Sequence, residues 1–181
     1  MIYVFLAKGF EEIEALTVVD FLRRAELEVY TVGIGSKIVA GSHNIPVFCD
    51  LDESEAAADA SVDAIVLPGG MPGTLNLEAN GKVSELIDYC VQNDKFVCAI
   101  CAAPSILGHR GLLDGRKATC FPGFEKELGT AEYTDDYVTR DGKFITAKGM
   151  GSSILFAKEI AGALSDKNKA EKIKESLQCP F

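Results

Sequence analysis

Short apolar runs alternate with helical patterns along the first half of this chain, and that alternation constrains its fold more than any other feature. Strand-like runs cover Ile2–Ala7, Glu28–Ile34, Ala64–Leu67 and Phe96–Ile100, and helical patterns cover Glu11–Ala25 and Lys82–Gln92. Strands interleaved with helices form parallel βαβ units, and the sheet they build must be covered on both faces. The sequence therefore predicts an α/β three-layer sandwich, with a mostly parallel central sheet and helices on both faces.

Three later features complete the expected architecture. Lys37–Cys49 contains short β-type pieces, which indicate a hairpin at the side of the sheet. Tyr137–Thr146 is typical of two strands joined by an Asp-Gly turn. Asp166 is a candidate N-cap for a last amphipathic helix, in which Ala170 and Ile173 share the apolar face.

Length and charge restrict the class of protein. The 181 residues, 48% of them hydrophobic, suffice for one core, so residues 1–181 are expected to form a single domain. The formal net charge of −9 argues against duplex nucleic acid and anionic membrane surfaces as partners, because both attract basic proteins. The first apolar run is too short for a signal peptide, and no segment could span a bilayer. We therefore expect a cytoplasmic protein that binds small molecules or proteins.

The six cysteines are scattered through apolar segments, which favours reduced thiols over a disulfide framework. The spacing Cys98-x-x-Cys101 also occurs in redox and zinc sites, but Cys98 falls inside a predicted strand. The chain has two histidines, His43 and His109, and no second cysteine pair, so a metal site is poorly supported. No feature of the sequence calls for a cofactor.

Cys101 is the strongest candidate for chemistry. It follows a predicted buried strand and precedes Pro104, which is favourable in the first turn of a helix. Ala99 and Ala103, two residues before and after it, are small, as a nucleophile elbow requires. The amides of the following helix would favour thiolate over thiol. The alternative, a small buried cysteine without function, fits this pattern less well.

Two further features converge on the same edge of the predicted sheet, where open α/β sheets bind ligands. Gly69 and Gly70 follow a strand, which lets backbone amides approach a ligand closely. Glu14 shares the apolar helix face of Val18, whereas Glu12 points nearly opposite and is explained by the helix dipole. A carboxylate on an apolar face needs a partner, so we expect Glu14 to be partly protonated and hydrogen-bonded to the Cys101 sulfur.

The chain resembles the ThiJ/PfpI family and, within it, the DJ-one (Parkinson disease protein) subgroup. The resemblance covers essentially the whole chain and is carried by the segments Leu6–Glu14, Val66–Gly70, Ala99–Pro104 and Ile145–Gly151. It implies a flavodoxin-like fold of the glutamine-amidotransferase-like superfamily and a homodimer. It also implies that Cys101 is the oxidisable nucleophile, that Glu14 is its protonated partner, and that the amides of Gly70 and Ala102 form an oxyanion pocket flanked by Gly69.

The sequence departs from the family pattern at three positions. Phe121 stands where catalytic members of the subgroup often have a histidine, so a general base is missing there. Ala102 follows the nucleophile where protease-like relatives carry a histidine, which makes a cysteine peptidase less probable than other functions. Lys148 stands where many relatives have arginine, and it would hold an anion as a point charge.

Two classes of function stay open at this point. The first is cofactor-free conversion of reactive carbonyls, of the glyoxalase III or protein deglycase type, with a small aldehyde or glycated substrate and Cys101 as nucleophile. The second is a redox-sensing, chaperone-like protein whose Cys101 is oxidised without turnover. The missing histidine at the position of Phe121 favours the second class, and a slow enzyme if the first applies.

Overall fold

The computed structural model describes residues 1–180 and has a seven-stranded sheet between two layers of helices. The strands in spatial order are β10 (Val138–Asp141), β11 (Phe144–Ala147), β7 (Phe96–Ile100), β6 (Ala64–Leu67), β1 (Ile2–Leu6), β2 (Val29–Gly33) and β5 (Leu51–Asp52). All neighbouring pairs are parallel except β10–β11, which is the Asp-Gly hairpin that the sequence predicts. The predicted mostly parallel sheet is therefore confirmed.

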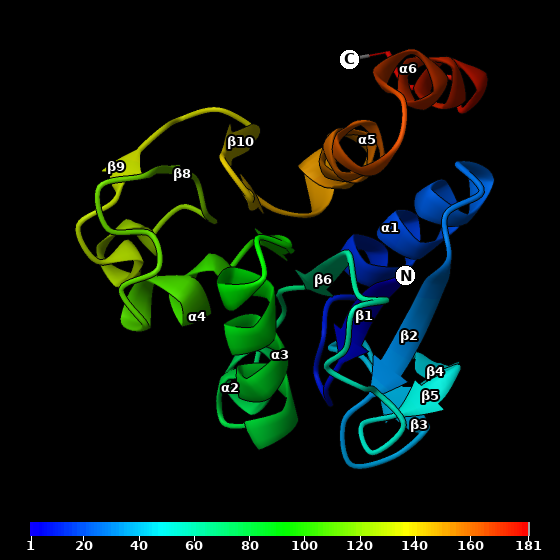
Figure 1. Cartoon of the computed structure of the whole chain (residues 1–181), viewed down its shortest axis with the longest axis vertical. Helices are drawn as coiled ribbons and strands as arrows, with labels where there is room; N and C mark the ends of the chain where they lie inside the picture. Colours follow the sequence, from blue (N-terminus) through cyan, green and yellow to red (C-terminus); the bar gives the residue numbers. More distant parts are fainter. Residues whose placement is uncertain (181) are drawn as a thin grey trace.

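The helices divide between the two faces of the sheet (Figure 1). One layer holds α1 (Glu12–Arg24), α5 (Ser153–Leu164) and α6 (Lys167–Ser176), and the other holds α2 (Gly73–Glu78), α3 (Gly81–Gln92) and α4 (Pro104–His109). Residues of β1 alternate between the layers: Val4 packs toward α1, and Phe5 packs toward α3. This alternation explains why the central strands are apolar on both sides.

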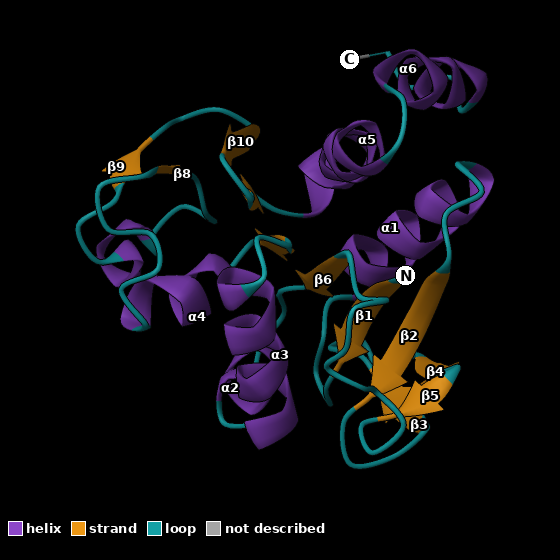
Figure 2. Ribbon diagram, viewed as in Figure 1, coloured by secondary structure: helices purple, strands orange, loops and turns teal. Residues whose placement is uncertain are grey.

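Smaller elements surround the sheet (Figure 2). They are β3 (Ile38–Ala40), β4 (Pro46–Phe48), β8 (Lys117–Ala118), β9 (Glu132–Tyr133) and the short 3₁₀ helices η1 (Glu125–Leu128) and η2 (Met150–Ser152). β3 and β4 form the predicted side hairpin. The Asp166 side chain accepts a hydrogen bond from the amide of Asn168, which confirms the predicted cap of α6. The sequence does not predict β5, α2, β8, β9, η1 or η2, which are short and lack a clear period.

Candidate functional site

Cys101 lies at the tight turn between β7 and α4. Its φ is +65°, in the left-handed region that L-residues seldom occupy. Both of its backbone groups are held: its amide donates to the Ala147 carbonyl at 2.9 Å, and its carbonyl accepts from the Phe121 amide at 2.8 Å. Ala103, which follows the turn, is fully buried, so a larger side chain would collide with the core. The backbone therefore forms the elbow that the sequence predicts, with a half-buried thiol at its apex.

Glu14 projects from the first turn of α1 into the same site. Its side chain is 1% exposed, and Oε2 accepts a hydrogen bond from the Gly69 amide at 2.9 Å. The Cys101 sulfur and the Met150 amide also interact with the carboxyl and lower its pKa. The contact with Cys101 is the one expected from the position of Glu14 on the apolar helix face. The Met150 amide was not expected, although the glycines around it at the end of β11 are a sequence signal for such a contact.

The two glycines after β6 bring backbone amides close to this pair. A Cβ atom at Gly69 would lie 2.6 Å from the Cβ of Cys101 and 2.7 Å from Oε2 of Glu14, so only glycine fits there. Gly70 has a φ of +91°. Its amide and that of Ala102 both donate toward the sulfur of Cys101. These two amides are the groups that the resemblance assigns to an oxyanion pocket.

Glu14 and Cys101 titrate as a coupled pair. Burial raises the pKa of Glu14 to about 7, against the lowering effect of its hydrogen bonds with Cys101 and Gly69. Burial, and then the negative charge of Glu14, raise the pKa of the Cys101 thiol to about 12, while the Ala102 and Gly70 amides lower it. Ionising both groups would put two negative charges in one poorly solvated site. A proton on Glu14 removes that repulsion and supplies a donor to the sulfur.

This result corrects the sequence expectation about the source of the thiolate. The sequence attributes a thiolate both to the amide end of the following helix and to a protonated Glu14, but α4 has only six residues and begins three positions after Cys101. At an N-terminus, the effect of a helix macrodipole falls off within the first turn. The protonation state of Glu14 is therefore the larger influence, and a thiolate at Cys101 requires that Glu14 carry the proton.

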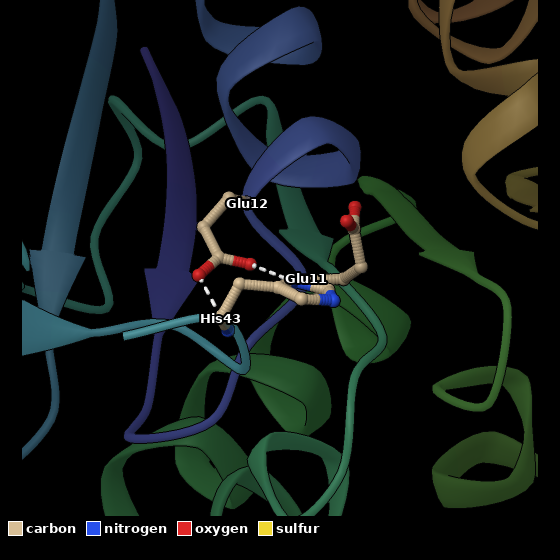
Figure 3. A group of neighbouring side chains, drawn as sticks. All are labelled: Glu11, Glu12 and His43. Carbon is tan, nitrogen blue, oxygen red and sulfur yellow. Dashed lines mark hydrogen bonds and ion pairs between the residues drawn. The ribbon is translucent and has the colours of Figure 1, made fainter. Parts of the chain in front are cut away.

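The burial of Glu12 is a second departure from the sequence expectation. The sequence analysis placed it on the solvent side of α1, yet it is 2% exposed because the loop of the side hairpin folds over it. Its carboxylate accepts from the His43 amide at 2.8 Å, contacts the His43 ring Nδ1 at 3.0 Å and accepts from the Ser42 hydroxyl at 3.1 Å (Figure 3). Although burial opposes it, these hydrogen bonds, led by the His43 side chain, lower the pKa of Glu12 to about 2. Glu12 thus fixes the β3–β4 hairpin to α1.

Glu11, Glu12 and His43 bring ligand-type atoms within 4.8 Å of one another. Each carboxylate already has protein partners, since Oε2 of Glu11 accepts from the Glu14 amide at 2.7 Å as the N-cap of α1. Figure 3 shows dashed contacts between Glu12 and His43 and none to the Glu11 side chain. The cluster therefore serves the start of α1 and the attached hairpin.

The remaining charged candidates lie outside the reacting pair. The Lys148 ammonium is paired with Asp135 and lies 5.6 Å from the centre of the Tyr137 ring, so its charge is already neutralised. His109, the last residue of α4, contacts Glu78 through Nδ1 at 2.6 Å and Glu127 through Nε2 at 2.9 Å. Both histidines of the chain are thus paired with carboxylates.

An apolar pocket of about 460 Å³ adjoins the site. Its walls include Phe121, Pro122, Tyr137, Lys148, Met150 and Leu155, and Gly149 forms part of its surface. A Cβ atom at Gly149 would lie 3.2 Å from the Phe121 ring and 3.7 Å from Oε1 of Glu14. The pocket is therefore separated from the Glu14 carboxyl by little more than one backbone segment.

The sequence model of the DJ-1/PfpI family matches residues 1–163. The chain belongs to the DJ-1/PfpI family. It is 33% identical over 177 residues to protein dj-1beta of Drosophila melanogaster, which covers 96% of this chain and 94% of the relative. It is 31% identical over 161 residues to deglycase PfpI of Pyrococcus furiosus, covering 87% and 95% of the two chains.

Solved structures of DJ-1/PfpI members have the same fold. A cysteine-to-alanine mutant of a DJ-1 superfamily protein from Salmonella typhimurium superposes with a TM-score of 0.93, at 36% identity over 99% of this chain and 98% of that one. The oxidized DJ-1 of Toxoplasma gondii gives a TM-score of 0.94 at 32% identity, over 99% and 98% of the two chains. Within residues 1–180, none of the helices combines the length and hydropathy needed to cross a bilayer.

Proposed function

We propose that this DJ-1/PfpI protein converts reactive 2-oxoaldehydes to 2-hydroxy acids without a cofactor, with Cys101 as nucleophile and Glu14 as proton carrier. The observation that carries the proposal is the juxtaposition of the Cys101 side chain with a buried carboxyl whose pKa burial raises to about 7. A group with that pKa can donate and accept a proton at neutral pH, which is the requirement for general acid–base catalysis. The PfpI relative, named a deglycase, supports chemistry on carbonyl adducts.

The reaction begins with addition of the sulfur to the aldehyde carbon while Glu14 gives its proton to the carbonyl oxygen, which yields a hemithioacetal. The amides of Gly70 and Ala102, beside the sulfur, stabilise the charge that develops on that oxygen. Glu14, now a carboxylate, removes the proton on the first carbon and returns it to the second, while the hydroxyl proton on the oxygen of the first carbon passes to the oxygen of the second. The product is a thioester of the 2-hydroxy acid, and water releases the acid and restores the thiol. Atoms and electrons balance without an external oxidant.

Lactate formation from methylglyoxal by the full-length protein tests this proposal. We expect product with wild type, and none above background with Cys101→Ser or Glu14→Gln. Cys179→Ser is the matched control, because Cys179 is also partly exposed but lies near the C-terminus. Equal rates for wild type and Cys101→Ser would overturn the proposal.

A second function, redox sensing, is favoured by the unequal exposure of the thiols. Cys49, Cys90, Cys98 and Cys120 are buried, whereas Cys101 is partly exposed beside a carboxyl that can donate to a sulfur-bound oxygen. One peroxide would convert the Cys101 thiolate to sulfenate with release of water, and a second would give sulfinate. Mass spectrometry after mild peroxide treatment should find two added oxygens at Cys101. Oxidation spread evenly over the six thiols would exclude this function.

We also propose that the protein acts in the cytoplasm as a homodimer. Five large apolar side chains of α1 and the side hairpin support a contact with a second copy, since they are exposed: Ile13, Leu16, Ile38, Ile45 and Phe48. Glu12 joins these two elements, so they form one surface. Light scattering coupled to gel filtration should give twice the mass of the chain, and Phe48→Ser should weaken the dimer.

A further inference from the structure

The proposed chemistry does not use the apolar pocket that adjoins the site. It has room for more than ten non-hydrogen atoms, because a water-sized group takes about 30 Å³ and the pocket holds about 460 Å³. Methylglyoxal has five such atoms, two of which are the reacting carbonyl carbons. Its single methyl group would leave most of the pocket empty.

The lining of the pocket indicates what kind of group fits. Phe121 is 46% exposed and Met150 is 55% exposed, so apolar side chains border the opening. The one charged group, the Lys148 ammonium, is already paired with Asp135 and lies over the Tyr137 ring. A neutral aromatic or branched aliphatic group would gain apolar contacts here, whereas a second carboxylate would have to displace Asp135.

The position of the pocket determines which part of a substrate reaches it. Phe121 donates its amide to the Cys101 carbonyl, and Gly149 lies between the Phe121 ring and the Glu14 carboxyl. A group that enters the pocket therefore lies one backbone segment away from the Glu14 carboxyl, against the residue whose amide holds the Cys101 turn. Such a group must be the substituent on the carbonyl, because the carbonyl itself has to reach Cys101.

From these observations we infer that the protein prefers 2-oxoaldehydes with a neutral aryl or bulky alkyl substituent, and that Phe121 is the specificity-determining residue. The inference rests on the proposed function for its substrate class. Phe121 supplies an aromatic wall and no proton-transfer group, so it selects the substituent and leaves proton transfer to Glu14. Binding of one added apolar group in a fitted pocket changes specificity by about tenfold or more.

Turnover is the first test of this inference. We expect wild type to convert phenylglyoxal with a kcat/KM about tenfold above that for methylglyoxal. Phe121→Ala should abolish most of this preference, so that the ratio of the two kcat/KM values approaches one. Phe124→Ala is the matched control, since Phe124 is in the same loop but outside the pocket lining. An unchanged ratio in Phe121→Ala would overturn the inference.

A second test does not depend on turnover, so its failure is distinguishable from failure of the proposed function. The rate of Cys101 alkylation is measured with iodoacetamide and with its N-phenyl derivative, and each rate is divided by that of free glutathione. We expect the aryl reagent to be favoured about tenfold in wild type and much less in Phe121→Ala. Equal normalised rates in wild type would overturn the inference even if methylglyoxal is converted. Loss of a dimer in Phe121→Ala, without a change in aryl preference, would show that a second copy fills the pocket and would also overturn it.

Discussion

Two glutamates in the first turn of α1 should have opposite effects on stability when each is replaced by glutamine. Glu14 is buried beside Cys101, and burial raises its pKa from 4.5 to about 7. Glu12 is buried under the hairpin loop, and its hydrogen bonds with His43 lower its pKa from 4.5 to about 2. Because the two residues are two positions apart on one helix, effects on helix propensity are the same for both. The difference in stability between the two variants therefore reports the environment of each carboxyl and not a general effect on α1.

The direction of the pH dependence for Glu14 follows from the protons that the folded and unfolded states bind. Between pH 4.5 and about 7 the folded state keeps a proton on Glu14 that the unfolded chain has lost, so wild-type stability falls as the pH rises through this range. Glutamine does not titrate, so Glu14→Gln should gain stability relative to wild type over the same range. A tenfold change in acid constant is worth about 1.4 kcal/mol, so the gain should be about 1–3 kcal/mol.

Glu12→Gln should behave in the reverse way. The depressed pKa of Glu12 contributes stability above pH 4.5 that is lost as the pH falls toward about 2. The variant should therefore be about 1–3 kcal/mol less stable than wild type at neutral pH and approach it in acid. Urea unfolding of the three proteins across these pH ranges measures both effects. Parallel stability curves for wild type and Glu14→Gln would refute the assignment of a protonated carboxyl beside Cys101.

Three other changes test separate parts of the structure. Gly69→Ala places a Cβ atom 2.6 Å from that of Cys101, so methylglyoxal conversion should fall about 100-fold while circular dichroism stays native; activity close to wild type would contradict the close approach described above. His109→Gln removes an imidazole whose pKa is raised first by its hydrogen bond to Glu127, so the loss of thermal stability should be greatest below pH 6.5 and disappear in alkaline buffer; a loss independent of pH would exclude the ion pair as its cause. Leu22→Ala empties a fully buried position in α1 and should lower the free energy of unfolding by about 2–5 kcal/mol, measured by urea titration; a loss well under 1 kcal/mol would contradict the packing of α1 on the sheet.

The sequence by itself determined the α/β class, the parallel strands and the elbow at Cys101, because these depend on local patterns. A buried parallel strand must be apolar over its whole length, and Phe96–Ile100 is. A tight turn into a helix needs small neighbours and tolerates proline, and both are present around Cys101. The unusual position of Glu14 on an apolar helix face also indicates a partner, because helix periodicity alone places it there.

Only the tertiary structure decided the electrostatics of the site. The burial of Glu12 depends on a hairpin loop thirty positions away in the chain, and helix periodicity carries no information about that loop. The proton on Glu14 depends on how deeply the carboxyl is desolvated and on its distance from one sulfur, which are properties of packing between segments. The apolar pocket likewise exists because Phe121, Tyr137 and Met150 converge from segments that are separate in the sequence. The protonation state of Glu14, the burial of Glu12 and the shape of the pocket all depend on contacts between segments distant in the sequence. Local sequence patterns therefore could not specify them.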